Sequence, residues 1–298
     1  MKTKLSTRIT AALAAAMIAV GAAVLPTSAK YNTSGTSQGE AFSSWYPTNW
    51  KNSEKWKYPA GKYWNGGNVE SYTNSPCTNQ TWDWHTWSNC NYMPFRFTIN
   101  SGYTALPSSE QCSSICQCYG FARKLAQDFY GGCKVWTRQR TYKNFTPRVG
   151  DQVRIKTGPT DDYGHSIFVT ETNGNAIKFA DCNWYGTCQI RWDVDGGFFH
   201  NGTFILGSTP YTVLWIDRPA MAGDVNGDST ITQADINAIS QIYRGVYNYG
   251  SANRKYVNEA ADLDNDGRVT YSDWAMAYYQ YTGNGYLQNQ RFLTWVDL

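Results

Sequence analysis

Residues 224–235 read Asp-Val-Asn-Gly-Asp-Ser-Thr-Ile-Thr-Gln-Ala-Asp, and residues 262–273 read Asp-Leu-Asp-Asn-Asp-Gly-Arg-Val-Thr-Tyr-Ser-Asp. The second segment begins 262 − 224 = 38 residues after the first. Both segments carry oxygen-bearing side chains at positions 1, 3, 5, 9 and 12, and a stretch with helical apolar periodicity follows each of them. The spacing therefore predicts two loop–helix units in tandem.

This ligand pattern is typical of calcium loops, because Ca²⁺ takes six to eight oxygen ligands and alternating short carboxylates wrap a loop around it. We expect two sites, with position 7 contributing its backbone carbonyl. Glycine is usual at position 6, but the first loop has Ser229 there, so a slightly strained turn and a weaker site are expected. The expected ligands are Asp224, Asn226, Asp228, Thr230 (carbonyl) and Asp235, and Asp262, Asp264, Asp266, Arg268 (carbonyl) and Asp273.

Two features distinguish these loops from an ordinary EF-hand. Position 12 is Asp rather than the longer Glu, and only one short helix is expected after each loop. Together with the Asp-Val-Asn-Gly-Asp opening, these features resemble the type I dockerin family. The resemblance implies a small all-α calcium-binding module over residues 223–285 that docks on a cohesin module of a scaffoldin, and hence a secreted protein of a polysaccharide-degrading complex, the cellulosome.

The recognition positions that the resemblance implies differ between the two copies. We therefore expect two binding faces that are not equivalent. The positions are Gln233, Ala234, Ser240 and Gln241 in the first copy and Tyr271, Ser272, Tyr278 and Tyr279 in the second.

The N-terminal residues predict a signal peptide over 1–29. Lys2, Lys4 and Arg8 precede an almost entirely apolar run over 9–25, and Thr27-Ser28-Ala29 supplies small residues for cleavage. The run is too short for a comfortable membrane span, so we expect no membrane span and a mature chain that starts near Lys30 with an extension over 30–54.

Export places the eight cysteines in an oxidising compartment. Cys182 and Cys188 flank a Trp-Tyr-Gly turn and are expected to form a local bridge, and Cys77 with Cys90 is a second candidate pair. The connectivity of Cys112, Cys116 and Cys133 does not follow from the sequence.

The composition excludes one class of partner and leaves another open. The formal charge is +3 and no block of Lys and Arg stands out, so no nucleic acid is expected. The 13 Trp and 22 Tyr residues fit either an aromatic core or a surface that stacks on sugars.

One segment in the larger, central part of the chain predicts a helix with a reactive thiol. Residues 117–130 read Gln-Cys-Tyr-Gly-Phe-Ala-Arg-Lys-Leu-Ala-Gln-Asp-Phe-Tyr, with an apolar stripe and a Gly pair after them. Cys118 falls in the first turn, where the helix dipole and unpaired backbone N–H groups favour the thiolate. The alternative is that Cys118 is one more bridge cysteine.

Two strands are expected to supply partners for that thiol. His165 lies in the alternating strand Gly-His-Ser-Ile-Phe-Val-Thr over 164–170, and Asp181 and Asn183 share one face of the next strand, 177–184. A thiolate, an imidazole and a carboxylate or amide form a nucleophile, a base and an orienting group.

The register of this hairpin decides whether the three groups meet. A two-residue Asn-Gly turn would give pairs that sum to 347 and would place Cys182 opposite His165, because a slip of one residue turns every side chain to the other face. We predict instead pairs that sum to 348, through a three-residue loop 173–175 with a bulge. Asp181 and Asn183 then both lie on the His165 side, and at least one is hydrogen-bonded to the ring.

The motifs Gln-Cys-Tyr-Gly-Phe-Ala, Gly-Asp (150–151), Gly-His-Ser, Asp-Cys-Asn-Trp and Tyr-Pro-Ala-Gly-Lys-Tyr-Trp-Asn (58–65) resemble the CHAP-type amidohydrolases and peptidases. The resemblance implies an α+β, papain-like domain over 55–216, a helix packed on a small antiparallel sheet, followed by a short linker over 217–222 and, after the dockerin, a tail over 286–298. It implies Cys118 as nucleophile and His165 as base. The third position is usually Glu, so Asp181 and Asn183 both stay open for it.

The expected activity is cleavage of an amide in peptidoglycan stem peptides or in protein. One alternative is a domain that kept the fold but lost activity. Another is a carbohydrate-binding module that contacts plant cell-wall polysaccharide through Trp45, Trp50, Trp56 and the stretch Trp82-Asp-Trp84-His-Thr-Trp87. A third is a glycosidase, for which Glu70, Asp83 and Glu110 offer carboxylates without a distinctive spacing.

Overall fold

The computed structural model describes residues 50–65, 71–76, 97–100, 104–105, 117–130, 135–140, 147–156, 164–250 and 254–282. The expected signal peptide, most of the extension over 30–54 and the tail over 286–298 lie outside these ranges. Several residues named above also lie outside them, namely Trp45, Glu70, Cys77, Trp82, Asp83, Trp84, Trp87, Cys90, Glu110, Cys112, Cys116 and Cys133. Among the described residues, none of the helices has the length and hydropathy of a membrane span.

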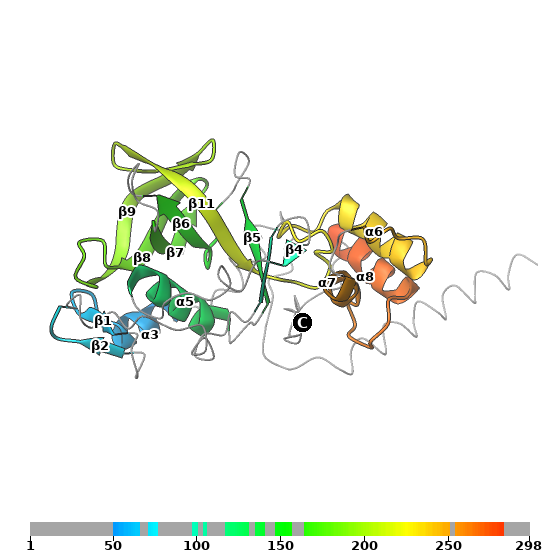
Figure 1. Ribbon diagram of the computed structural model, residues 1–298, viewed down its shortest axis with the longest axis horizontal. Coiled ribbons are helices and arrows are strands. Elements are labelled where there is room, and N and C mark those ends of the chain that lie inside the picture. Colours follow the sequence, from blue (N-terminus) through cyan, green and yellow to red (C-terminus); the bar gives the residue numbers. More distant parts are fainter. Residues whose placement is uncertain are drawn as a thin grey trace, which may run out of the picture. The chain divides into compact units, whose positions relative to one another are not determined.

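Six antiparallel strands form a closed barrel (Figure 1). Each strand pairs with the next along the chain, and β11 closes the barrel by pairing with both β6 and β10. The strands are β6 (Gln152–Lys156), β7 (His165–Asn173), β8 (Ala176–Cys182), β9 (Ile190–His200), β10 (Thr203–Leu206) and β11 (Thr209–Pro219).

The expected papain-like arrangement of a helix on a small antiparallel sheet is therefore wrong. The residues around 165–183 predict a hairpin, but they carry no information on whether the sheet stays open. Closure depends on bends farther along the chain. Register shifts interrupt β7–β8, β8–β9 and β11–β6, and such bulges increase twist and allow a sheet to curl into a barrel.

Alternating apolar residues fill the barrel interior. Every second residue of a strand points inward, and the inward set is a continuous cluster of β-branched and aromatic side chains. It consists of Val153, Ile155, Ile167, Val169, Ile177, Phe179, Phe199, Phe204, Val213 and Ile216.

Helix α5 (Gln117–Tyr130) packs on the outside of β7 and β8. Its fully buried Phe121 and Leu125 contribute to a second core that includes Phe168 of β7 and Cys182 of β8. The helix α3 (Trp50–Lys57) and the hairpin of β1 (Tyr63–Asn65) and β2 (Ser71–Thr73) lie near α5 (Figure 1). Trp50 belongs to this core, whereas Trp56 is 83% exposed.

Beyond the barrel, β11 continues into a three-strand extension made of β5 (Val135–Gln139), β3 (Phe97–Asn100) and β4 (Thr104–Ala105). A fully buried ion pair joins β5 to β11, with Nε and Nη2 of Arg138 each 2.8 Å from a carboxylate oxygen of Asp217. The sequence suggested that the linker begins at residue 217, but β11 includes residues 217–219.

In the described residues that follow β11, three short helices occur: α6 (Gln233–Tyr243), α7 (Arg254–Ala261) and α8 (Tyr271–Tyr281). Capping boxes begin α6 and α8, in which Thr232 and Thr270 pair with Asp235 and Asp273. A compact apolar core that includes Ile236, Ile239, Tyr256, Val257 and Ala277 joins the three helices.

Candidate functional site

Cys118, His165 and Asp181 meet at one end of the β7–β8 hairpin. Cys118 is the second residue of α5, His165 is the first residue of β7, and Asp181 is the last but one of β8. Because α5 packs across both strands, the thiol at its first turn reaches the hairpin end. Cys118 and His165 line the same cavity, each shifts the pKa of the other, and Nε2 of His165 lies 2.8 Å from Oδ2 of Asp181.

The predicted register of the hairpin is confirmed next to the site. Phe168 pairs with Ala180 and Val169 pairs with Phe179, and both pairs sum to 348. The predicted loop is wrong, because Asn173 pairs with Ala176 across a two-residue turn and the register changes between Val169 and Glu171 instead. The bulge within the strand thus has the effect that we expected from an odd loop.

Cys118 is a free, buried cysteine whose surroundings favour the ionised thiolate over the thiol. Burial alone raises the pKa of Cys118, but the charges of His165 and Arg154 outweigh it and bring this pKa to about 6. Nη1 of Arg154 lies 3.6 Å from Sγ and donates to Ser166 Oγ at 2.9 Å. The sequence patterns did not single out Arg154, because a charged residue in a strand resembles an ordinary surface position.

His165 is held as an imidazolium. Burial lowers the pKa of His165, whereas the Cys118 thiolate and the hydrogen bond to Asp181 raise it to about 9. Between these two pKa values the site holds a thiolate–imidazolium pair, and the apparent pKa values belong to the pair rather than to either group.

Asp181 has a second cationic partner that the motifs did not reveal. Arg191 donates from Nε to Oδ1 at 2.8 Å and from Nη2 to Oδ2 at 2.5 Å. Burial raises the pKa of Asp181, but the hydrogen bonds from His165 and Arg191 hold this pKa below its usual value. Arg191 lies directly opposite Asp181 on β9, so only the barrel's strand order could have identified it.

Asn183 has a different place from the one expected. Its Nδ2 donates to Gln117 Oε1 at 3.4 Å, and its Oδ1 accepts from the backbone N–H of Cys188 at 2.9 Å. The hydrogen-bond partner of the His165 ring is thus Asp181. The expected disulfide is wrong, since Cys182 and Cys188 are both buried and are not bonded to each other.

A cavity of ≈ 320 Å³ opens next to the thiol. The Trp184 ring meets the His165 ring edge-on, with centroids 4.8 Å apart, and Tyr211 packs edge-on against Trp184. The lining residues are Gln117, Cys118, Gly164, His165, Asn183, Trp184 and Tyr211. The cavity therefore joins a nucleophile and a base to aromatic walls and amide side chains.

The two acidic loops have the same backbone design. In the first, Asp224 accepts from the N–H groups of Asp228 and Ser229 at 3.0 and 2.8 Å. In the second, Asp262 accepts from those of Asp266 and Gly267 at 3.1 and 2.9 Å. Positions 4 and 6 are left-handed in both loops, with φ of 70° and 66° in the first and 62° and 86° in the second.

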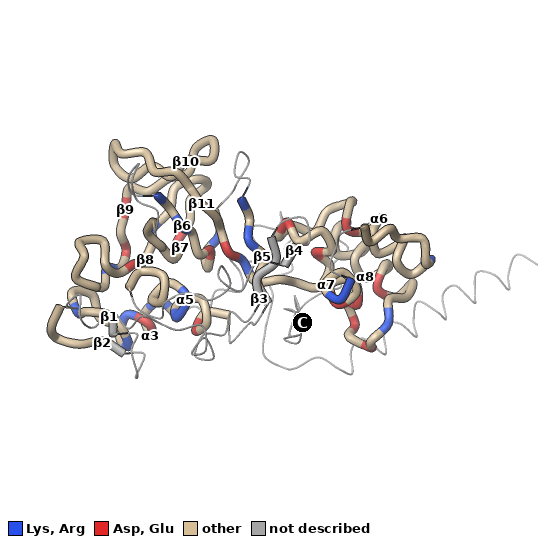
Figure 2. Tube along the Cα trace, in the orientation of Figure 1, with Lys and Arg blue, Asp and Glu red and all other residues tan. Residues whose placement is uncertain are grey.

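The carboxylates of these loops fit a divalent cation. Burial and the neighbouring Asp235 and Asp228 raise the pKa of Asp224 well above its usual value, and burial and Asp273 raise that of Asp264 to about 6. Oxygen atoms of Asp262, Asp264 and Asp273 all lie within 4.8 Å of one another. Such crowded carboxylates are hard oxygen donors of the kind that Ca²⁺ prefers, and acidic residues recur on the loops around α6 and α8 (Figure 2).

Most of the expected recognition residues are accessible. Tyr271, Tyr278 and Tyr279 are 56%, 39% and 46% exposed. Gln233, Ala234 and Gln241 are exposed as well, and Ser240 and Ser272 are half-buried.

Comparison with known proteins identifies one part of the chain. No curated protein and no solved structure matches the sequence. The CHAP-type resemblance of the barrel region therefore stays a prediction. Residues 222–277 match the family model of the Dockerin type I domain, so the C-terminal segment is a dockerin, a calcium-binding module that implies a cohesin partner and an extracellular, cellulosome-type setting.

Proposed function

We propose that the barrel domain is a cysteine hydrolase that cleaves an amide bond and that the dockerin attaches it to a scaffoldin. The observation that carries this proposal is that Cys118 and His165 line one cavity of ≈ 320 Å³, with the His165 ring held by Asp181 at 2.8 Å. An activated thiol, a base and an orienting carboxylate are the parts that nucleophilic acyl transfer needs. The CHAP-type motifs support the same chemistry, although the papain-like fold first expected is not part of the proposal.

In the proposed mechanism, the Cys118 thiolate attacks the carbonyl carbon of the amide, and the C=O electron pair moves onto the oxygen. The imidazolium of His165 then gives its proton to the leaving nitrogen as the C–N bond breaks, which leaves a thioester on Cys118. In the second half, His165 takes a proton from water as the hydroxyl oxygen attacks the thioester. The carboxylic acid product leaves and the thiolate is restored.

Donors for the oxyanion are available beside the nucleophile. The first N–H groups of a helix have no partner within the helix, so the backbone N–H of Cys118, in the first turn of α5, can donate to the oxyanion. The side-chain amide of Gln117 lines the same cavity, and Asn183 holds its Oε1. Fixed donors of this kind stabilise negative charge that develops during acyl transfer.

The substrate is proposed to be a peptide, either a peptidoglycan stem or a protein segment. A cavity of ≈ 320 Å³ is at the small end of the range for ligand sites, and it suits one or two residues around the scissile bond. The aromatic walls of Trp184 and Tyr211 would contact apolar parts of such a chain.

The dockerin is proposed to hold two calcium ions with the ligands predicted from the sequence. In that arrangement the first ion binds Asp224, Asn226, Asp228, Asp235 and the carbonyl of Thr230. The second binds Asp262, Asp264, Asp266, Asp273 and the carbonyl of Arg268.

The test uses the calcium-loaded full chain with purified peptidoglycan in one assay and an unfolded protein in another. New amino groups are labelled and identified by mass spectrometry, with Cys118→Ala as the matched control. We expect new amino termini with the wild type alone. Equal cleavage by Cys118→Ala, cleavage that persists after Cys118 is alkylated by iodoacetamide, or no cleavage of either substrate by the unmodified wild type contradicts the proposed activity.

A further inference from the structure

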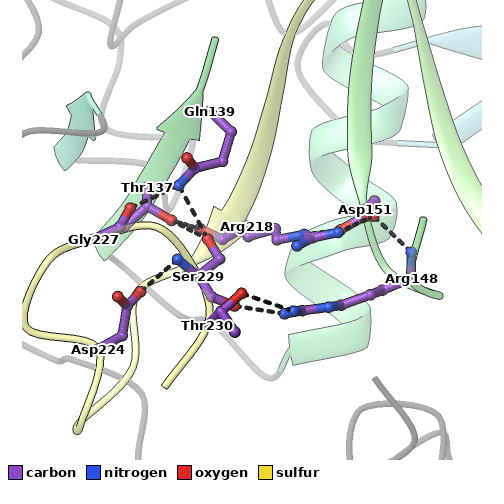
Figure 3. A network of polar contacts seen from close by, with 9 residues as sticks. All are labelled: Thr137, Gln139, Arg148, Asp151, Arg218, Asp224, Gly227, Ser229 and Thr230. Atoms are coloured by element: carbon purple, nitrogen blue, oxygen red, sulfur yellow. Dashed lines mark hydrogen bonds and ion pairs between the residues drawn. The ribbon is translucent and has the colours of Figure 1, made fainter. Parts of the chain in front are cut away.

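The first calcium loop contacts the barrel domain through Ser229 (Figure 3). This side chain is 1% exposed. Its Oγ lies 2.8 Å from Oγ1 of Thr137 and accepts from Nε2 of Gln139 at 3.3 Å. Both partners belong to β5, and Gln139 also donates to the carbonyl of Gly227 at 2.6 Å. Position 6 of the loop is thus a point of attachment to β5.

The second loop provides an internal comparison. Its position 6 is Gly267, which is exposed, and a Cβ added there would meet nothing within 4 Å. Both residues have left-handed backbone, with φ of 66° at Ser229 and 86° at Gly267, a conformation that costs a non-glycine residue energy. The hydrogen bonds of Ser229 to β5 give a physical reason for a side chain at the position where the equivalent loop has none.

Arg148 holds the same loop from a second direction. Its Nη1 donates to the carbonyl of Ser229 at 2.7 Å, and its Nη2 donates to Oγ1 of Thr230 at 3.3 Å. The backbone N–H of Arg148 donates to Asp151 at 2.7 Å, and Asp151 forms a two-point ion pair with Arg218 of β11. The contact is therefore anchored to the barrel at β5, at β11 and at the residues just before β6.

The attachment and the expected calcium site use backbone groups of the same two neighbouring residues, Ser229 and Thr230. The N–H of Ser229 donates to Asp224 Oδ2 at 2.8 Å, and that carboxylate is the first expected ligand. The carbonyl of Ser229 accepts from Arg148, whereas the next carbonyl, of Thr230, is the expected ligand at position 7. Fixing this turn around a cation therefore fixes the groups that the barrel binds.

We infer that the first calcium loop is a calcium-dependent latch that fastens the dockerin to the barrel domain through Ser229, Thr137, Gln139 and Arg148. The inference rests on the proposed calcium site of the first loop. With calcium bound, the turn is preorganised for its barrel partners. Without calcium, repulsion among the loop carboxylates opens the turn and the latch releases, so the hydrolase domain is held rigidly only in the calcium-loaded protein.

Hydrogen exchange on the full chain tests the latch, with calcium alone as the ligand. We expect calcium to slow exchange of the backbone amides in 135–139 and 148–151 by about tenfold in the wild type. In Ser229→Gly and in Thr137→Val, the slowing of exchange in 135–139 by calcium should be clearly smaller than in the wild type, because the contact between Ser229 and Thr137 is lost, while calcium still protects α6 and α8. Gly267→Ser is the matched control, because it makes the reverse exchange at the equivalent position of the second loop, where an added Cβ meets nothing within 4 Å. Gly267→Ser should weaken calcium binding by the second loop, and calcium should still slow amide exchange in 135–139.

Calorimetric titration of the same samples with calcium distinguishes a failure of the proposed calcium site from a failure of the latch. If the first loop takes up no calcium, the proposed calcium site is wrong and the latch is wrong with it. If both loops fill but exchange in 135–139 does not respond in the wild type, the latch alone is overturned. The same holds if Ser229→Gly and Thr137→Val respond as the wild type does.

Discussion

The carboxylate of Asp181 accepts hydrogen bonds from His165 and from Arg191 at once, with Nε2 of His165 2.8 Å from Oδ2. Two cationic partners keep this buried group ionised, and its charge is shared between them. Asp181 thus orients the imidazole, while Arg191 limits how strongly the carboxylate can raise the pKa of His165.

The first prediction concerns the reactivity of the thiol. Because the pKa of Cys118 is lowered to about 6, its alkylation by iodoacetamide should rise through pH 6 and reach a plateau below pH 8. In His165→Gln the cationic partner of Cys118 is lost, and burial then raises the pKa of the thiol. The pH of half-maximal alkylation should therefore rise by about two units or more. The measurement is the alkylation rate against pH, with the modified residue identified by mass spectrometry.

Cys182 and Cys188 serve as internal references in that experiment. Both are buried in the core beside α5 and should react only when the protein unfolds. Alkylation of Cys118 that is half-maximal near pH 8 or above in the wild type contradicts the ion pair.

The second prediction separates Asp181 from Asn183. Asp181 raises the pKa of His165 toward about 9, so Asp181→Asn should lower it and the ring should lose its proton at a lower pH. Asn183→Ala should leave this pKa in place, because Asn183 bonds to Gln117 and Cys188 instead. The chain has three histidines, so an NMR titration can follow the His165 ring directly. A shift in Asn183→Ala without one in Asp181→Asn would reverse the assignment.

The sequence predicted local relationships better than global ones. The alternation in 164–183 fixed which faces of the two strands the side chains occupy, and the helix start placed the thiol near them. Neither pattern contains the pairing of β11 with β6 and β10 that closes the barrel. Arg191 was missed for the same reason, since its position opposite Asp181 depends on the neighbouring strand β9.

The acidic loops were predictable because each is defined by twelve contiguous residues. The contact of Ser229 with Thr137 was not, because it joins residues 92 positions apart. From the sequence alone, Ser229 indicated only strain. The structure adds that its hydroxyl is a hydrogen-bond partner for β5.

The third prediction concerns calcium removal. The buried carboxylate of Asp224 faces Asp228 and Asp235, so a chelator should destabilise the dockerin by the binding free energy, about 2.7 kcal/mol at a hundredfold excess of calcium over Kd for each site. The loss should appear as reduced helical circular dichroism and lost cohesin binding. Asp273→Ala, which removes one of the proposed ligands of the second loop, should cause part of this loss. Unchanged spectra and cohesin binding in chelator contradict it.

The fourth prediction concerns the turn that leads into β6. Gly150 has φ of 93°, and a Cβ there would lie 2.7 Å from Cζ of Tyr130 and 2.8 Å from Cε1 of Phe129. Its N–H donates to the carbonyl of Val169 at 2.9 Å, which ties the turn to β7, so it cannot move away without breaking this bond.

Gly150→Ala should therefore destabilise the protein by about 3 kcal/mol, from backbone strain and overpacking together. Gly186→Ala is the control, because Gly186 also has positive φ, 75°, yet a Cβ there meets nothing within 4 Å. That variant should lose only the backbone term, about 1–2 kcal/mol. Urea unfolding of the calcium-loaded chain measures both. Equal losses in the two variants would mean that the end of α5 yields to the added methyl group and that its packing against the turn is loose.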